Sequence, residues 1–268
     1  MLFNFRLAAL EQVKPWGEPP SQRLHWFGLT DGQYWLQVGK DALFEYSEAA
    51  RQKSGCPRYC SYQVVRLYED VLEIVSDVLE PVPSDISPYL NLDRRMKWGR
   101  AYNAWAQDAE SRLPEDQYWE SIDVATSWIG ERTLDSAYLT PSTRIQLWSD
   151  GRDVHVEWDN RDKLIEGVEA WTATAGSYAI PIAAFIAEVQ SFHDRLMAQM
   201  FERVGSVRAG RLPENVEVDI GALAKEHEQR AKPVTRYFLQ REEKDWKQVR
   251  EVIEEIKKYG LASDESGH

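Results

Sequence analysis

Two segments of the chain alternate between apolar and polar residues around an Asp-Gly pair. The first, WFGLTDGQYWLQVG, covers residues 26–39, and the second, IQLWSDGRDVHVEWDN, covers residues 145–160. Alternation indicates a half-buried strand, and Asp-Gly favours a tight hairpin turn. We therefore predict two β-hairpins, turning at Asp31-Gly32 and at Asp150-Gly151. Residues 1–10 and 42–47 predict further strands for the first sheet, and residues 170–178 predict a third strand for the second.

Elsewhere apolar residues recur every three or four positions, which indicates amphipathic helices. One predicted helix starts near Cys60 and ends at the sequence EPVPSD, because proline cannot continue a helix. A second long helix is predicted from about Pro181 to about Arg208. Shorter helices are predicted at residues 87–112, 115–131, 219–231 and 245–260, and Asp219 and Asp245 are suitable N-caps for the last two. Residues 261–268 are expected to form a loose tail.

Both halves of the chain thus contain three strands followed by a long helix. We predict an α+β fold with two antiparallel three-stranded sheets, each packed by a long helix, and this order could reflect a βββα duplication. Chance is the alternative, since hairpins and amphipathic helices are common. The predicted organisation is an N-terminal βββα unit (1–83), a helical insert (84–140), a second βββα unit (141–212) and C-terminal helices (213–268), within one compact domain overall.

The net charge of −12 over 268 residues bears on the kind of partner. Nucleic acids and anionic lipids are bound through an excess of Lys and Arg, so this charge disfavours both. It favours a basic protein partner, although acidity also serves solubility alone. The first residues, MLFNFRLAAL, lack the pattern of a signal peptide, and the chain has no apolar run of about 18 residues. We therefore expect a cytoplasmic protein that does not enter a membrane.

Candidate catalytic chemistry is sparse. None of the five histidines lies in a metal-binding motif, and no nucleophile motif is present. Cys56 and Cys60 form one C-x3-C pair without the second pair of a zinc site, so free thiols are expected. His155, flanked by Asp153 and Glu157, is the best candidate for acid–base chemistry, although a solvated strand face is the favoured interpretation. We predict no catalytic residue, no metal site and no cofactor.

The chain has eleven tryptophans, and aromatic side chains among acidic ones are typical of surfaces that bind basic proteins. On the predicted hairpins several such residues share the outer, more polar faces. The predicted partner-binding residues are Trp148, Asp153, His155, Glu157 and Asp159 on the second sheet, and Trp26 and Trp35 on the first.

The motifs WFGLTDGQYWL and WDN…WTATAGSY…SFHDRLM resemble an uncharacterised bacterial protein family, over residues 3 to 208. That family supplies no catalytic residues to transfer. In general character the chain is similar to immunity proteins, which are acidic and protect a cell by binding a toxin. The resemblance and the composition together suggest a non-enzymatic immunity protein that occludes the active site of a toxin. The alternatives are a hydrolase that uses His155 with nearby carboxylates, and a self-associating structural protein.

Overall fold

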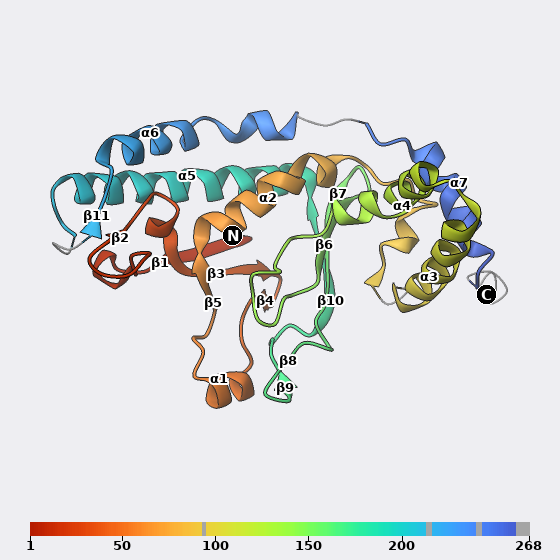
Figure 1. The fold of residues 1–268 in the computed structure, drawn as a ribbon, viewed down its shortest axis with the longest axis horizontal. Helices are drawn as coiled ribbons and strands as arrows, with labels where there is room; N and C mark the ends of the chain where they lie inside the picture. Colours follow the sequence, from red (N-terminus) through yellow and green to blue (C-terminus); the bar gives the residue numbers. More distant parts are fainter. Residues whose placement is uncertain (93–94, 213–215, 240–242, 261–268) are drawn as a thin grey trace.

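A computed structural model describes residues 1–92, 95–212, 216–239 and 243–260 of the protein. The predicted α+β class is confirmed: antiparallel sheets lie beneath two long helices, α2 (Val64–Leu79) and α5 (Ile182–Arg208), as Figure 1 shows. Helix α6 (Ile220–Arg230) runs alongside α5. Helices α3 (Arg95–Arg112), α4 (Glu115–Gly130) and α7 (Trp246–Lys257) gather at one end of the molecule (Figure 1). The predicted tail at 261–268 lies outside the described residues.

The first sheet is built around β3 (Asp31–Val38). Strand β1 (Phe3–Leu7) pairs with one edge of β3, and β4 (Asp41–Leu43) and β5 (Cys60–Gln63) pair with the other, all antiparallel. The predicted turn at Asp31-Gly32 is wrong, because both residues lie within β3 and a short 3-10 helix, η2 (Gly28–Thr30), precedes them. The tight two-residue turn lies instead at Gly39-Lys40, between β3 and β4, where Gly39 has a φ of 60°.

Gly32 has a different role from the one predicted. It pairs with Leu7 of β1, and a Cβ atom at this position would lie 2.4 Å from the carbonyl oxygen of Arg6. The glycine is therefore needed for a close approach of two backbones rather than for a turn.

The second sheet confirms the second predicted hairpin. Strands β6 (Ile145–Ser149), β7 (Asp153–Asp159) and β10 (Ala175–Pro181) pair in the order β10-β7-β6, all antiparallel. The loop is longer than a two-residue turn, so facing positions shift by two residues and Trp148 faces His155. An even shift leaves every side chain on its predicted face. The predicted core residues of this hairpin are buried, namely Ile145, Leu147, Val154, Val156 and Trp158.

Two small ladders and several short helical elements make up the rest of the secondary structure of the described residues. Strands β2 (Gln22–Arg23) and β11 (Val216–Glu217) pair in parallel, and β8 (Leu164–Ile165) and β9 (Val168–Glu169) pair antiparallel. The remaining short helical elements of the described residues are η1 (Leu10–Gln12), α1 (Glu48–Ser54), η3 (Ser87–Tyr89) and η5 (Val234–Phe238). The predicted N-caps are confirmed, since the Asp219 carboxylate accepts from the Ala222 N–H and the Asp245 carboxylate accepts from the Gln248 N–H.

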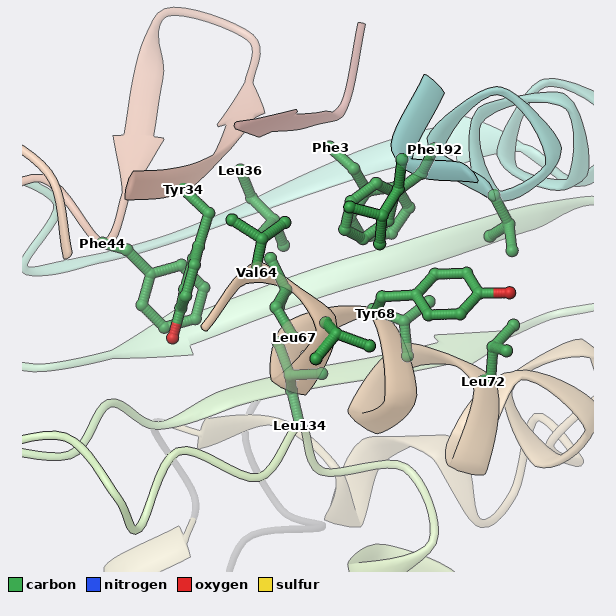
Figure 2. Packing of buried hydrophobic residues seen from close by; sticks show 14 of the residues in the cluster. Phe3, Tyr34, Leu36, Phe44, Val64, Leu67, Tyr68, Leu72, Leu134 and Phe192 are labelled. Atoms are coloured by element: carbon green, nitrogen blue, oxygen red, sulfur yellow. The ribbon is translucent and has the colours of Figure 1, made fainter. Parts of the chain in front are cut away.

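The main hydrophobic core lies between the helices and both sheets. Figure 2 shows Phe3 of β1 beside Phe192 of α5, and Leu67 and Tyr68 of α2 beneath them. Helix α2 contacts strands of both sheets, and so does α5, so the two helices form one shared layer rather than one cover for each sheet. The predicted duplication rested on a turn at Asp31-Gly32 and on one covering helix for each sheet. Neither feature is found in the described structure, so the duplication is unconfirmed.

A second hydrophobic cluster joins the helices at one end of the molecule. It contains Trp98 and Trp105 of α3, Trp128 of α4 and Ile253 of α7, and these pack against Trp148 of β6. Segments far apart in the sequence therefore close over the outer face of the second sheet. In the described part of the chain, no helix has the length and apolar character needed to cross a bilayer.

Candidate functional site

Trp26 does not lie on an exposed sheet face, and its prediction as a partner-binding anchor was wrong in this respect. The side chain is completely buried, because α6 lies across it. Its ring stacks with His227, and the guanidinium of Arg230 lies 4.5 Å from the ring centroid. Trp26 therefore stabilises the contact between α6 and the main core.

Trp35 and Trp148 are also packed against neighbours. Trp35 is half-buried and stacks on Tyr59, with ring centroids 4.1 Å apart. Trp148 is 9% exposed and stacks on His155 at 4.2 Å, beneath the second hydrophobic cluster. The outer face of the second sheet, predicted to be free, is covered by helices at this tryptophan.

The four polar residues predicted on β7 do share one face of the strand. Asp153, His155, Glu157 and Asp159 are all half-buried and alternate with buried apolar residues. Most of their charge is compensated within the fold. His155 Nε2 lies 2.9 Å from Asp150 Oδ2, and Asp159 pairs with Arg161 at 2.8 Å.

Backbone N–H donors and His155 lower the pKa of Asp150, and the hydrogen bond from Arg161 lowers the pKa of Asp159. Asp150 and Asp159 are thus already paired within the fold, while Glu157 and Asp159 also line a cavity of about 320 Å³. Among the described residues, His155 lines none of the four best-formed cavities.

A stronger candidate lies on α2. A cleft of about 420 Å³ separates the polar face of α2 from the segment that follows α4. Arg66, Asp70, Glu73 and Asp77 lie three or four residues apart, so they line one face of the helix. The opposite wall carries Glu131 and Asp135. The described lining residues contribute five carboxylates and one guanidinium, that of Arg66. We call this site the acidic cleft.

Asp70 lies at the floor of the acidic cleft, where its side chain is 1% exposed. Tyr138 donates a hydrogen bond of 2.8 Å to Asp70 Oδ2, and Tyr34 donates in turn to Tyr138 at 3.2 Å. Arg66 Nε lies 3.1 Å from Asp70 Oδ1, and Arg66 also binds Asp135 at 2.8 Å.

Burial raises the pKa of Asp70 to about 7, although the Tyr138 hydrogen bond and Arg66 act in the opposite direction. The nearby carboxylates of Asp135 and Glu73 add to the increase. One buried carboxyl of the acidic cleft therefore titrates in the neutral pH range.

At the other end of the acidic cleft the negative charge is only partly compensated, by Arg132 and Lys244. Burial raises the pKa of Asp77, and repulsion from Glu131 adds to this. Glu131 itself binds Lys244 at 2.7 Å. In the described part of the chain, no salt bridge joins Glu73 or Asp77 to a cation.

A model described as "Family of unknown function (DUF5984)" matches residues 2–252. The chain belongs to this family. The predicted resemblance to an uncharacterised family is thereby confirmed, and the match extends well beyond residue 208. No curated protein and no solved structure matches the chain. The family description names no activity, so the chemistry must be argued from the site.

The acidic cleft combines open space with carboxylate side chains. In the part of the chain that the structure describes, no group of three or more His, Cys, Asp or Glu side chains is arranged to hold a metal. The carboxylates are instead spread along two walls of a cleft of about 420 Å³. A cleft of this size has room for a guanidinium or an ammonium group, and hydrogen bonds between such a cation and a carboxylate are charge-assisted.

Sequence reasoning missed this site, although the sequence pattern indicates one of its two walls. The spacing of Arg66, Asp70, Glu73 and Asp77 marks one polar face of a predicted helix, and such a face is normally solvated. Nothing local indicates that residues 131–135 return to cover it.

Proposed function

We propose that the protein is a non-enzymatic binding protein that receives a cationic group of a basic partner in the acidic cleft. The main support for this proposal is that five carboxylates line one cleft. Arg66 is the one cation among the described lining residues. The overall charge of −12 supports it, because complementary potentials speed the encounter with a basic protein and orient it.

The raised pKa values of Asp70 and Asp77 supply the driving force. Ionising these carboxyls in the empty cleft is unfavourable, because they are buried and near like charges. A guanidinium from a partner would compensate the charge, so it would bind the ionised form better than the neutral form. Binding is then linked to proton release from Asp70, and affinity increases as the pH rises through 7.

The finer form of this proposal is an immunity protein that acts in the cytoplasm. A toxin that cuts nucleic acid or transfers phosphate needs basic residues in its active site. An acidic cleft that engages one of them would occlude that site without chemistry. The tryptophans first assigned to this contact are buried or stacked, so the proposal now rests on the acidic cleft.

A defined cationic probe tests the proposal directly. Isothermal titration calorimetry with a tetra-arginine peptide would compare the wild type with the triple variant Asp70→Asn, Glu73→Gln, Asp77→Asn. A matched variant with the same change in charge, Asp153→Asn, Glu157→Gln, Asp159→Asn, alters only the β7 face.

We expect binding by the wild type and by the β7 variant, and at least tenfold weaker binding by the cleft variant. We also expect the affinity of the wild type to increase several-fold from pH 6 to pH 8. Equal loss in both variants would show that net charge, and not the acidic cleft, attracts the peptide.

A second candidate function is acid–base catalysis, and one observation favours it. Asp70 has a pKa of about 7 and is joined through Tyr138 to Tyr34. A general acid or base works best when its pKa lies near the working pH. This replaces the predicted role of His155, whose imidazole is bound to Asp150. Turnover of any compound that disappears in Asp70→Asn would favour the enzyme over the binding protein.

Self-association is the remaining alternative from the sequence. Size-exclusion chromatography with light scattering separates it from the binding proposal. A mass that increases with protein concentration would favour a structural role.

A further inference from the structure

A second cavity lies between η3, α3, α4 and β6, and we call it the aromatic cavity because three aromatic side chains line it. Its volume is about 310 Å³, and Tyr89, Trp98, Tyr102 and Ile129 line it. The Tyr89 and Trp98 rings lie 5.4 Å apart and are tilted by 51°. An apolar cavity of about 150 Å³ is enough to admit benzene, and ligand pockets begin at about 300 Å³. The aromatic cavity therefore has room for a molecule with two fused rings.

One polar group in this aromatic cavity is unused. Gln146 of β6 lines it and is 1% exposed, and Gln146 Oε1 has no hydrogen-bond partner among the described protein atoms. Buried amide oxygens almost always accept a hydrogen bond, so this one is an exception that needs an explanation.

The orientation of the Gln146 amide follows from its neighbour. The Thr133 hydroxyl donates to the carbonyl of Ile129 at 2.9 Å, so its oxygen is left to accept. Gln146 Nε2 lies 3.4 Å from that oxygen and is its donor. The amide nitrogen is thereby assigned to Thr133, and Oε1 remains as an acceptor for a ligand.

The residues that line the aromatic cavity also indicate the charge of the ligand. None of the described residues that line the aromatic cavity carries a formal charge. A charged molecule would lose its hydration there without compensation. We propose that the aromatic cavity binds a small, neutral, planar aromatic molecule, and that one N–H or O–H group of this molecule donates to Gln146 Oε1. This site is separate in chemistry from the acidic cleft.

Two probes of nearly equal shape test the proposal. Indole has one N–H donor, and 1-methylindole has none. Their binding to the full-length wild type and to Gln146→Met would be measured by saturation-transfer NMR titration. Gln33→Met, on the remote strand β3, controls for the introduction of a methionine.

We expect the wild type and Gln33→Met to bind indole about tenfold more tightly than 1-methylindole, because one hydrogen bond to a buried acceptor is lost. In Gln146→Met the two probes should bind equally. Equal affinity of the two probes for the wild type would overturn the role of Gln146.

If Gln146→Met does not fold, the location of indole in the wild type decides the question. Intermolecular NOEs should connect indole to the Ile129 methyl groups and to the Tyr102 ring. NOEs to other residues only would reject the aromatic cavity as the site. Absence of indole binding at millimolar concentration would overturn the proposal altogether, and it would mean that solvent satisfies Gln146.

Discussion

The substitution Asp70→Asn should change how the stability of the protein depends on pH. In the folded protein burial keeps the Asp70 carboxyl protonated up to about pH 7, whereas its ordinary pKa is 3.8. Between these two pH values the unfolded chain binds fewer protons than the folded protein. The free energy of unfolding contributed by Asp70 is therefore highest below about pH 4, and it is lost as the pH rises to 7. Asparagine keeps the neutral shape and cannot ionise.

The magnitude follows from the displacement of the pKa. A tenfold change in proton affinity corresponds to about 1.4 kcal/mol, so a pKa that moves from 3.8 to about 7 sets an upper limit of about 4 kcal/mol. The acidic cleft is open to solvent, which screens its charges, and we expect about half of this limit, about 2 kcal/mol. Only the part of this loss between pH 5 and about pH 7 lies within the measured range, so relative to the wild type Asp70→Asn should be about 1 kcal/mol more stable at pH 8 than at pH 5.

Urea unfolding followed by tryptophan fluorescence at pH 5 and pH 8 provides the measurement. The difference between variant and wild type cancels the titration of other groups, such as His193 and His227. Asp135→Asn is the matched control, because backbone hydrogen bonding lowers the pKa of Asp135 and places its titration below this pH range. A stability difference between Asp70→Asn and the wild type that does not change with pH would refute a neutral-range titration of Asp70.

Three further predictions concern the rest of the fold. Arg132→Met should destabilise the protein by about 3–5 kcal/mol in urea unfolding, because the buried Glu80 carboxylate loses its salt bridge of 3.2 Å. Adding Glu80→Gln should recover part of this loss. Gly176→Ala should cost about 1–3 kcal/mol in the same assay, because its Cβ would lie 2.4 Å from the facing tryptophan ring of β7; an unchanged midpoint would contradict this packing. At pH 8 a thiol reagent should modify Cys56 in the native protein and Cys60 only after unfolding, because Cys60 is buried and burial raises its pKa to about 12. Mass spectrometry of the labelled peptides would show which cysteine was modified.

The helices could be predicted from the sequence because their signals are local. The apolar stripe of α5 repeats at helical spacing, and the residues predicted for it are buried, from Phe185 to Val204. Pro181 and Asp245 mark helix starts through backbone geometry and capping, which involve only adjacent residues.

The first sheet could not be predicted in the same way, because its pairing joins distant segments. Asp31-Gly32 has the composition of a hairpin turn, but β1 lies against this position and requires the missing side chain of Gly32. The local preference for a turn was outweighed by a contact with a strand more than twenty residues earlier. At Asp150-Gly151 the predicted hairpin formed, although with a longer loop and a register shifted by two residues.

Surface exposure was the least predictable property. Trp26 and Trp148 occupy positions that alternate with core residues, which suggests an outer face. Their burial depends on α6 for Trp26 and on the α3–α4–α7 helices for Trp148, and no pattern within the strands reports where those helices pack. Composition supplied the number of tryptophans but not which of them would be covered.

Helix α2 connects the fold to the candidate site, and its two faces allow stability and binding to be separated. The apolar face packs between the two sheets, while the polar face forms one wall of the acidic cleft. Glu73 is exposed on that wall, so its replacement removes a charge from the cleft at little cost to the core. Asp70 is buried between the two faces, so its replacement alters both properties. The binding proposal therefore requires Glu73→Gln to weaken cation binding while leaving the unfolding midpoint unchanged, whereas Asp70→Asn should change both. If the two substitutions affected stability alone, the carboxylates of α2 would be part of the scaffold and not a receptor for a cation.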